Sequence, residues 1–412
     1  MSYEKKQRLK LFPILLTYFL DNFGLAIIYP IFTPLLLKTS HSFLSFSTPF
    51  HERTLILGLL IGAFPLAQFF SAPIIGQFSD RFGRKRAFYI TILGTALGYT
   101  FTSISIMEHS LIWLFISRFC TGLFAGNLTL CLAAVADMSP DDVTRTKNFG
   151  LIGAIGGLSF IIAITFGGIL SDSTISNHFN PSFPFWITAL LSYINFVCMI
   201  RLFSETHPST PHSGINPFKG FHNLRLGLKN IELRPMYIIN FLFMLTWVAL
   251  MQFFPTFLLI HWQFQPQEIT FCLIAIGAVW SLSNFFINRQ LAKYFFPGKT
   301  LLLGLISLFL LLLMIPFSNT PLTFLFLFLA AACCASLCWT NGIATISLKA
   351  PSAIQGSILG INQSMTSIAA ILSPILGGIL IALSQQAIYI FDGIITLISF
   401  SILLIYKAYE HH

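Results

Sequence analysis

The polar stretch at residues 76–86 reads GQFSDRFGRKR and interrupts a chain that is otherwise strongly apolar. Of the 412 residues, 55% are hydrophobic and only 9% are charged, against roughly 25% charged residues in ordinary globular proteins. So few charges cannot cover the surface of a soluble protein of this length. The composition therefore excludes soluble enzymes and secreted disulfide-rich domains, and it indicates a protein that resides in a lipid bilayer.

Apolar segments follow one another on both sides of this stretch, and each is long enough to cross about 30 Å of hydrocarbon as a helix. The predicted spans are 11–37, 54–78, 87–107, 110–136, 148–171, 184–203, 234–260, 267–290, 299–317, 321–348, 355–382 and 386–406. We therefore predict an all-α integral membrane protein with twelve transmembrane helices.

The basic residues predict the orientation of these helices. If the N-terminus is cytoplasmic, all of the 23 Lys and Arg except Lys38, Arg53 and Arg118 fall on the cytoplasmic side or at cytoplasmic helix ends. This asymmetry is the positive-inside rule, so both termini are expected in the cytoplasm, as in a bacterial inner-membrane protein. The net charge of +9 is then a sign of topology and does not indicate nucleic-acid binding.

One long polar interval, residues 204–233, divides the chain into predicted bundles at 1–203 and 234–412. Phe218, Phe221, Leu224 and Leu228 recur in it at helical spacing, which suits either a short helix on the inner leaflet or a plain flexible linker. The two halves also share glycines. Gly150 and Gly167–Gly168 recur 210 positions later as Gly360 and Gly377–Gly378, which predicts two pseudo-symmetric six-helix bundles.

Ionisable residues inside the spans are rare, and such residues usually mark function because each costs several kcal/mol to insert. Asp21 and Arg118 are expected at similar depth on the first and fourth spans, each roughly 12–15 Å from a surface at 1.5 Å per residue. We expect Asp21 to bind and release a proton under the influence of Arg118, or the two to form a static ion pair. Asp392 lies nearer the end of its span, where it either faces water at the outer mouth or has a functional role, and the sequence leaves that choice open.

Polar amides within the spans are the candidates for lining a substrate cavity, because they can hydrogen-bond a solute in an aqueous chamber or bridge neighbouring helices. The candidates are Asn22, Asn127, Gln252, Asn284, Asn341 and Gln363.

The loop at 76–86 has a physical interpretation as a conformational latch. Gly76 permits the close approach of a neighbouring helix, and Gly83 permits a tight turn. Asp80 is expected at the positive N-terminal end of the span that begins after Pro351. The alternative is that the basic residues, Arg81 and Arg84 among them, only enforce topology.

This loop resembles the signature loop of the major facilitator superfamily, with Gly76, Asp80, Arg81, Gly83 and Arg84 to Arg86 in matching positions. The first span, DNFGLAIIYPIF, and Arg118 with Gly122 and Gly126 resemble the tetracycline/proton antiporters of the drug:proton antiporter branch. The resemblance implies the twelve-helix major facilitator fold and implies that Asp21 is needed for transport.

Two departures from that branch leave the substrate and direction open. Gly98 stands where tetracycline exporters carry an acidic residue in the third helix. The fifth span has Ser159, Ala163 and Ile164 where the antiporter motif has glycine, glycine and proline. The sequence therefore does not favour tetracycline as the substrate.

We expect a proton-coupled secondary transporter of a small organic molecule that works by alternating access as a monomer, with efflux by antiport as the first reading. The alternative is a proton-driven importer of an organic anion such as an amino acid or siderophore. We expect no enzymatic activity, no metal site and no cofactor beyond the proton gradient. A membrane enzyme and a sensor that no longer transports are weaker hypotheses, because no catalytic cluster or signalling domain is evident.

Overall fold

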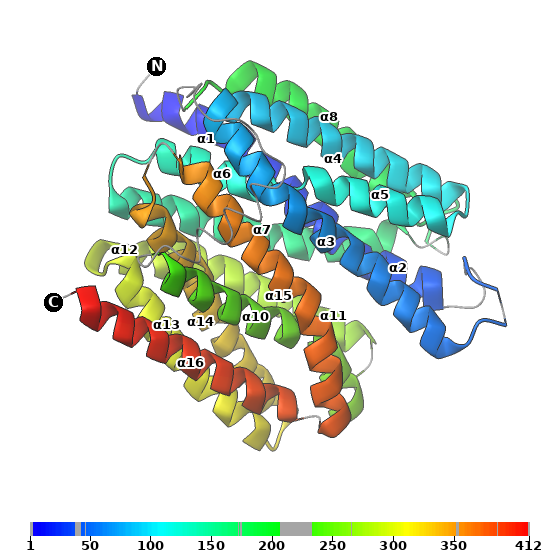
Figure 1. The fold of residues 1–412 in the computed structure, drawn as a ribbon. Coiled ribbons are helices and arrows are strands. Elements are labelled where there is room, and N and C mark those ends of the chain that lie inside the picture. Colours follow the sequence, from blue (N-terminus) through cyan, green and yellow to red (C-terminus); the bar gives the residue numbers. More distant parts are fainter. Residues whose placement is uncertain are drawn as a thin grey trace. The chain divides into compact units, whose positions relative to one another are not determined.

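The computed structural model describes residues 3–37, 43–45, 47–171, 173, 175–206, 233–264, 266–351, 354–384 and 386–410. Within these ranges the regular structure is entirely helical, as expected (Figure 1). Most of the interval 204–233, including its candidate amphipathic segment, lies outside them.

The α-helices of the first half are α1 (Tyr3–Ala26), α2 (Ile28–Leu37), α3 (Phe50–Phe82), α4 (Arg84–Met107), α5 (Leu111–Phe124), α6 (Asn127–Asp137), α7 (Asp142–Leu170) and α8 (Phe183–Leu202). Those of the second half are α10 (Arg234–His261), α11 (Pro266–Leu282), α12 (Arg289–Tyr294), α13 (Pro297–Met314), α14 (Pro321–Lys349), α15 (Gln355–Leu383) and α16 (Ala387–Glu410). A π-helix, η2 (Ser283–Asn288), joins α11 to α12, and a 3-10 helix, η3 (Ile315–Phe317), follows α13.

The helices follow the predicted spans. Among the described residues, 11 helical segments are long and apolar enough to cross a membrane, and each coincides with a predicted span. The predicted span 355–382 coincides with α15, which is not one of these segments. Short turns separate α4 from α5 and α13–η3 from α14, where the sequence offers only a few polar residues.

Two predicted spans are interrupted in a way that their apolar sequences do not reveal. The first breaks at Ile27, between α1 and α2, and the fourth breaks at Ala125 and Gly126, between α5 and α6. Irregular backbone at membrane depth must have its polar groups satisfied by the protein. Gln68 of α3 does so at the second break, because its Nε2 donates to the carbonyl oxygen of Ala125 at 2.6 Å.

The chain forms two compact units. One comprises the described residues within 1–138, 159–220 and 353–360, and the other comprises those within 139–158, 221–352 and 361–412. Helices α7 and α15 are each divided, with one part in the first unit and the other part in the second. These units group residues that contact one another and do not test the predicted division into 1–203 and 234–412, which stays a prediction.

Small residues let the helices of the first unit pack closely, as is usual for helices in lipid. A Cβ added at Gly24 of α1 would lie against the ring of Tyr99 of α4, and one at Gly98 would lie against Thr121 of α5. One at Gly122 of α5 would lie 2.8 Å from Ala67 Cβ and 3.0 Å from the Cα of Phe64. These contacts hold α3, α4 and α5 together around a buried core that includes Phe23, Phe32 and Phe185.

Glycine has the same role in the second unit, where the first part of α7 packs on the end of α11 and on η2. A Cβ at Gly153 would lie 2.9 Å from the Asn284 amide, and one at Gly157 would lie 2.9 Å from the carbonyl oxygen of Gly277. The π-helix brings Asn284 and Asn288 to this contact, and both are buried. Single π-turns within α-helices often occur at functional positions.

We predict that Gly122→Ala lowers the stability of the protein, because the new methyl group meets backbone atoms of α3 that cannot rotate away. The expected loss is about 1–3 kcal/mol, as for overpacked cores. Gly58→Ala on α3 is the matched control, since nothing lies within 4 Å of its added Cβ. Thermal unfolding of both purified variants checks this, and equal melting temperatures would contradict the packing described.

Candidate functional site

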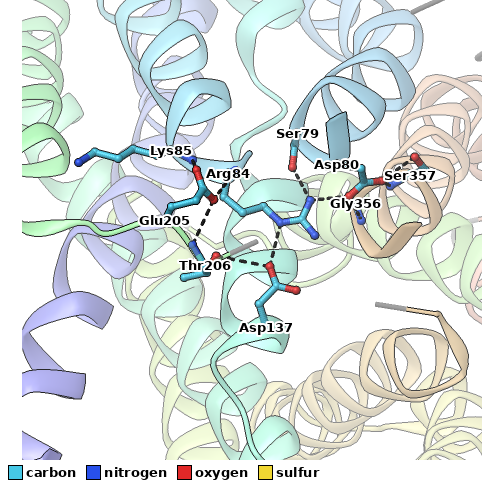
Figure 2. Close-up of polar contacts among 9 residues, drawn as sticks. All are labelled: Ser79, Asp80, Arg84, Lys85, Asp137, Glu205, Thr206, Gly356 and Ser357. Atoms are coloured by element: carbon cyan, nitrogen blue, oxygen red, sulfur yellow. Dashed lines mark hydrogen bonds and ion pairs between the residues drawn. The ribbon is translucent and has the colours of Figure 1, made fainter. Parts of the chain in front are cut away.

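The loop at 76–86 folds around the guanidinium of Arg84, which is fully buried at the start of α4. Its Nη1 donates to the hydroxyl of Ser79 and to Asp80 Oδ1, both at 2.5 Å. Its Nε donates to Asp137 Oδ2 at 2.9 Å (Figure 2). One cation therefore joins the last turn of α3, the first turn of α4 and the C-terminus of α6.

Asp80 lies at the N-terminal end of α15, where the sequence analysis expected it. Its Oδ1 accepts from the backbone N–H of Gly356 at 2.9 Å, and its Oδ2 accepts from the N–H and the hydroxyl of Ser357, both at 2.7 Å (Figure 2). The first N–H groups of a helix have no partner within the helix and carry its positive partial charge. Asp80 therefore caps α15 while it also neutralises Arg84.

Glycines make this contact sterically possible. A Cβ at Gly76 would lie 2.9 Å from the carbonyl carbon of Gly356, and one at Gly360 would lie 2.7 Å from the carbonyl oxygen of Ala72. Gly83 turns the chain between α3 and α4 at φ 94°, a backbone conformation that favours glycine. Arg81, the remaining predicted latch residue, is half-buried, and its guanidinium lies 5.0 Å from the Phe82 ring centroid.

Glu205 belongs to the same cluster, although no sequence pattern indicated it. Its carboxylate accepts from the backbone N–H groups of Arg84 at 2.8 Å and Lys85 at 3.1 Å, so it caps α4. The next residue, Thr206, donates its hydroxyl to Asp137 at 3.4 Å (Figure 2). The available signal was an acidic residue directly after a predicted helix, but spacing alone does not say which helix end it reaches.

Asp21 and Asn127, predicted for different roles, are hydrogen-bonded partners in the first unit. Asn127 is the first residue of α6, directly after the break, and its Nδ2 donates to Asp21 Oδ1 at 2.9 Å. Asp21 is half-buried. Within the described part of the chain, its carboxylate forms no ion pair with Arg118.

Arg118 is fully buried on α5, and its three guanidinium nitrogens have no hydrogen-bond partner in the structure. It lies between aromatic rings, 4.8 Å from the centroid of Phe64 and 5.8 Å from that of Phe32. Cation–π contacts of this kind contribute about 2 kcal/mol or more when desolvated. They do not replace the several kcal/mol of hydration that a buried charge loses, so this guanidinium is incompletely satisfied in the conformation described.

The other candidate amides are divided between the units. Asn22, in the first, donates to the carbonyl of Tyr18 on its own helix. In the second unit, Asn341 donates to Asn288 at 2.8 Å, while Asn284 accepts from the hydroxyl of Thr340. Gln363 is buried and Gln252 is exposed. The role of these amides in lining one substrate cavity stays a prediction.

A cavity of about 140 Å³ lies in the second unit between the first turn of α7 and the α12–α13 connection. Its lining includes Asp142, Thr146, Lys293 and Phe296, and none of the predicted site residues.

The burial of Asp392 differs from the expected exposure to water. Exposure was one of the two alternatives that the sequence left open, but Asp392 is buried on α16 with 1% of its surface exposed.

We predict that Glu205→Gln destabilises the protein by about 0.5–2 kcal/mol, the usual value of a helix N-cap. The substitution keeps the shape of the side chain and removes the charge that favours the N-terminus of α4. Glu108→Gln is the matched control, because Glu108 lies at the C-terminal end of the same helix, where a negative charge is unfavourable. Thermal unfolding should show a lower melting temperature for Glu205→Gln and no decrease for Glu108→Gln. A decrease for Glu108→Gln without one for Glu205→Gln would refute the capping role.

Comparison with known proteins agrees with this architecture. The profile of the Major Facilitator Superfamily matches residues 14–306 and 236–412. The class B tetracycline resistance protein of Escherichia coli is 25% identical over 384 residues, covering 92% of this chain and 89% of that protein. The class H tetracycline resistance protein of Pasteurella multocida is 32% identical over 194 residues, which cover 47% of this chain and 44% of that protein. The crystal structure of the human organic anion transporter MFSD10 has a TM-score of 0.81 at 19% identity, covering 96% of this chain and 99% of that one. The chain therefore belongs to the major facilitator superfamily and is an integral membrane protein with the fold of these transporters.

Proposed function

We propose that the protein is a proton-coupled secondary transporter that moves a small organic molecule by alternating access, with efflux by proton antiport as its direction. It would act as a monomer in the inner membrane of a bacterium, with both termini in the cytoplasm. The proton gradient would supply the energy, so no cofactor is required. Membership in a superfamily of transporters supports this proposal, and two relatives named for tetracycline resistance support efflux.

The observation that carries the proposal is the environment of Asp21. It stands about ten residues into the span Leu11–Phe32, roughly 15 Å along the helix axis from its end. Its carboxylate accepts a hydrogen bond from the neutral amide of Asn127. An amide N–H can donate to an ionised or a protonated carboxyl group, so Asn127 orients Asp21 without fixing its charge. Such a carboxyl group can gain and lose a proton within the membrane.

The cluster around Arg84 supports the alternating-access part of the proposal. Asp80, from the first half of the sequence, caps α15, from the second half, through three hydrogen bonds. We propose that these bonds hold one conformation of the transporter and break when the other forms. A contact made in one state only is what allows a substrate or proton to shift a two-state equilibrium.

A proton-driven importer of a small organic anion is the second candidate, and Arg118 favours it. Its guanidinium is buried without a carboxylate partner among the described residues. The carboxylate of a substrate could form the bidentate pair that arginine prefers. The two candidates differ in the direction of net transport.

The substrate must be identified before the directions can be separated. Purified protein can be screened by thermal shift against amino acids, siderophores, metabolites and antibiotics, tetracycline included, because a ligand of the folded state raises the melting temperature. A compound found in this way then serves as the probe in liposomes.

We predict that Asp21→Asn abolishes transport driven by a pH gradient in such liposomes, whereas substrate exchange without a gradient continues. The amide is isosteric with the carboxyl group but cannot carry a proton at these pH values. Glu108→Gln, an exposed acid in a turn, serves as the control and should transport normally. Unchanged gradient-driven transport by Asp21→Asn would refute the proton role.

We also predict that Asp80→Asn slows turnover while substrate affinity changes little. The variant loses the charge that pairs with Arg84 and with the N-terminus of α15. Initial rates in liposomes and binding by thermal shift separate the two quantities. Weaker binding at normal turnover would argue against a conformational role of this contact.

A further inference from the structure

Asp392 of α16 is a buried acid for which the proposed mechanism has no use. Its exposed fraction is 1%, and its Oδ2 is buried without a hydrogen-bond partner. Among the described residues, the ion pairs are formed by Asp80 and Asp137, both with Arg84, and none reaches Asp392. Of the carboxylate oxygens that the structure describes, this one alone is both buried and unpaired.

The surroundings of Asp392 are apolar and aromatic. Helix α16 packs against α10, α13 and η3. Tyr389, one turn before Asp392, is buried, and its ring centroid lies 5.1 Å from that of Phe257 on α10. Gly393, which directly follows Asp392, faces Leu312 and Leu313 of α13.

The lysine and arginine residues of the neighbouring helices lie far from this position, and one histidine lies nearer. Lys299 of α13 is 13 residues before Leu312, about 20 Å along the helix. Arg234 of α10 is 23 residues before Phe257, about 35 Å along that helix. His261, at the exposed end of α10, stacks on Phe257 at 4.9 Å, and η3 (Ile315–Phe317) has no ionisable side chain.

Physical chemistry then decides the state of this carboxyl group. An ionised carboxylate without partners in a low-dielectric interior costs many kcal/mol, whereas an unsatisfied neutral polar group costs about 1–3 kcal/mol. In the conformation described, the surroundings of Asp392 therefore favour the protonated form over the ionised form. Asp392 lies five residues after Ala387, about 8 Å along the axis from the N-terminal end of α16.

We propose that Asp392 is a second proton-binding site, in the second unit, that releases and regains its proton during the transport cycle. The inference rests on the proposed proton coupling and extends it. Asp21 and Asp392 belong to different units, so each unit has an acid of its own. When the end of α16 becomes hydrated, the carboxylate gains the solvation that it lacks in this conformation, and its proton leaves to water.

The test uses protons alone as the probe, on the full-length protein in liposomes. Infrared difference spectra between low and high pH report the carbonyl stretch of each protonated carboxylic acid that titrates. A pH-indicator dye counts the protons taken up per chain. We expect the wild type to show a carboxylic-acid band that Asp392→Asn removes and Asp21→Asn retains, with one proton fewer taken up by Asp392→Asn. An acid band and a proton count that Asp392→Asn leaves unchanged would overturn the proposal.

Two further variants keep the outcome interpretable. Asp142→Asn replaces an exposed acid in the first turn of α7 and should leave the acid band in place. If Asp392→Asn does not fold, Asp392→Glu keeps the acid, and it should shift the band without removing it, while an unshifted band overturns the proposal. The spectra need no substrate, so a failure of the transport test on Asp21 and a failure here can be told apart.

Discussion

The buried guanidinium of Arg84 holds together the elements on which the candidate latch depends. It bonds to Ser79 and Asp80 at the end of α3 and to Asp137 at the end of α6. A buried cation in this position is stable only with its carboxylates in place, because loss of one partner of a buried ion pair typically costs about 3–5 kcal/mol. The geometry of Asp80, and through it that of the α15 N-terminus, therefore follows from one side chain.

Helix N-termini complete the balance of charge around Arg84. Asp80 and Glu205 each direct a carboxylate at the first N–H groups of a helix, α15 and α4 respectively. Each such end carries roughly half a positive charge, which favours the ionised form of both acids. Backbone dipoles have a second use here. If α15 moves as proposed, the Asp80 bonds to its backbone amides would break, whereas the pair of Asp80 with Arg84 links only the end of α3 to the start of α4.

Two other ionisable groups differ from this satisfied cluster. Arg118 is buried between aromatic rings with three unpaired nitrogens, and Asp392 is buried with an unpaired oxygen. In lipid such groups are costly, and their persistence usually reflects a role in another state of the protein. Arg118 lacks an anion and Asp392 lacks solvent or a cation. A transporter that exposes these positions alternately would supply both at different points of its cycle, which is why we propose a role in transport for each group.

The sequence by itself determined the helical membrane fold, since its apolar spans and basic loops follow from the thickness and dielectric of the bilayer. The expectation that Asp80 lies at the start of the span after Pro351 came from the signature loop that the sequence resembles, and it suits the preference of an acid for the positive N-terminal end of a helix. Tertiary structure alone decided the breaks at Ile27 and Ala125, which depend on side chains such as Gln68 from another helix. It alone paired Asp21 with Asn127, 106 positions apart, and brought Glu205 to α4 across 121 positions. The burial of Asp392 could not be predicted either. The sequence gives the depth of a residue along a helix, but it does not show which face of the helix the neighbouring helices cover.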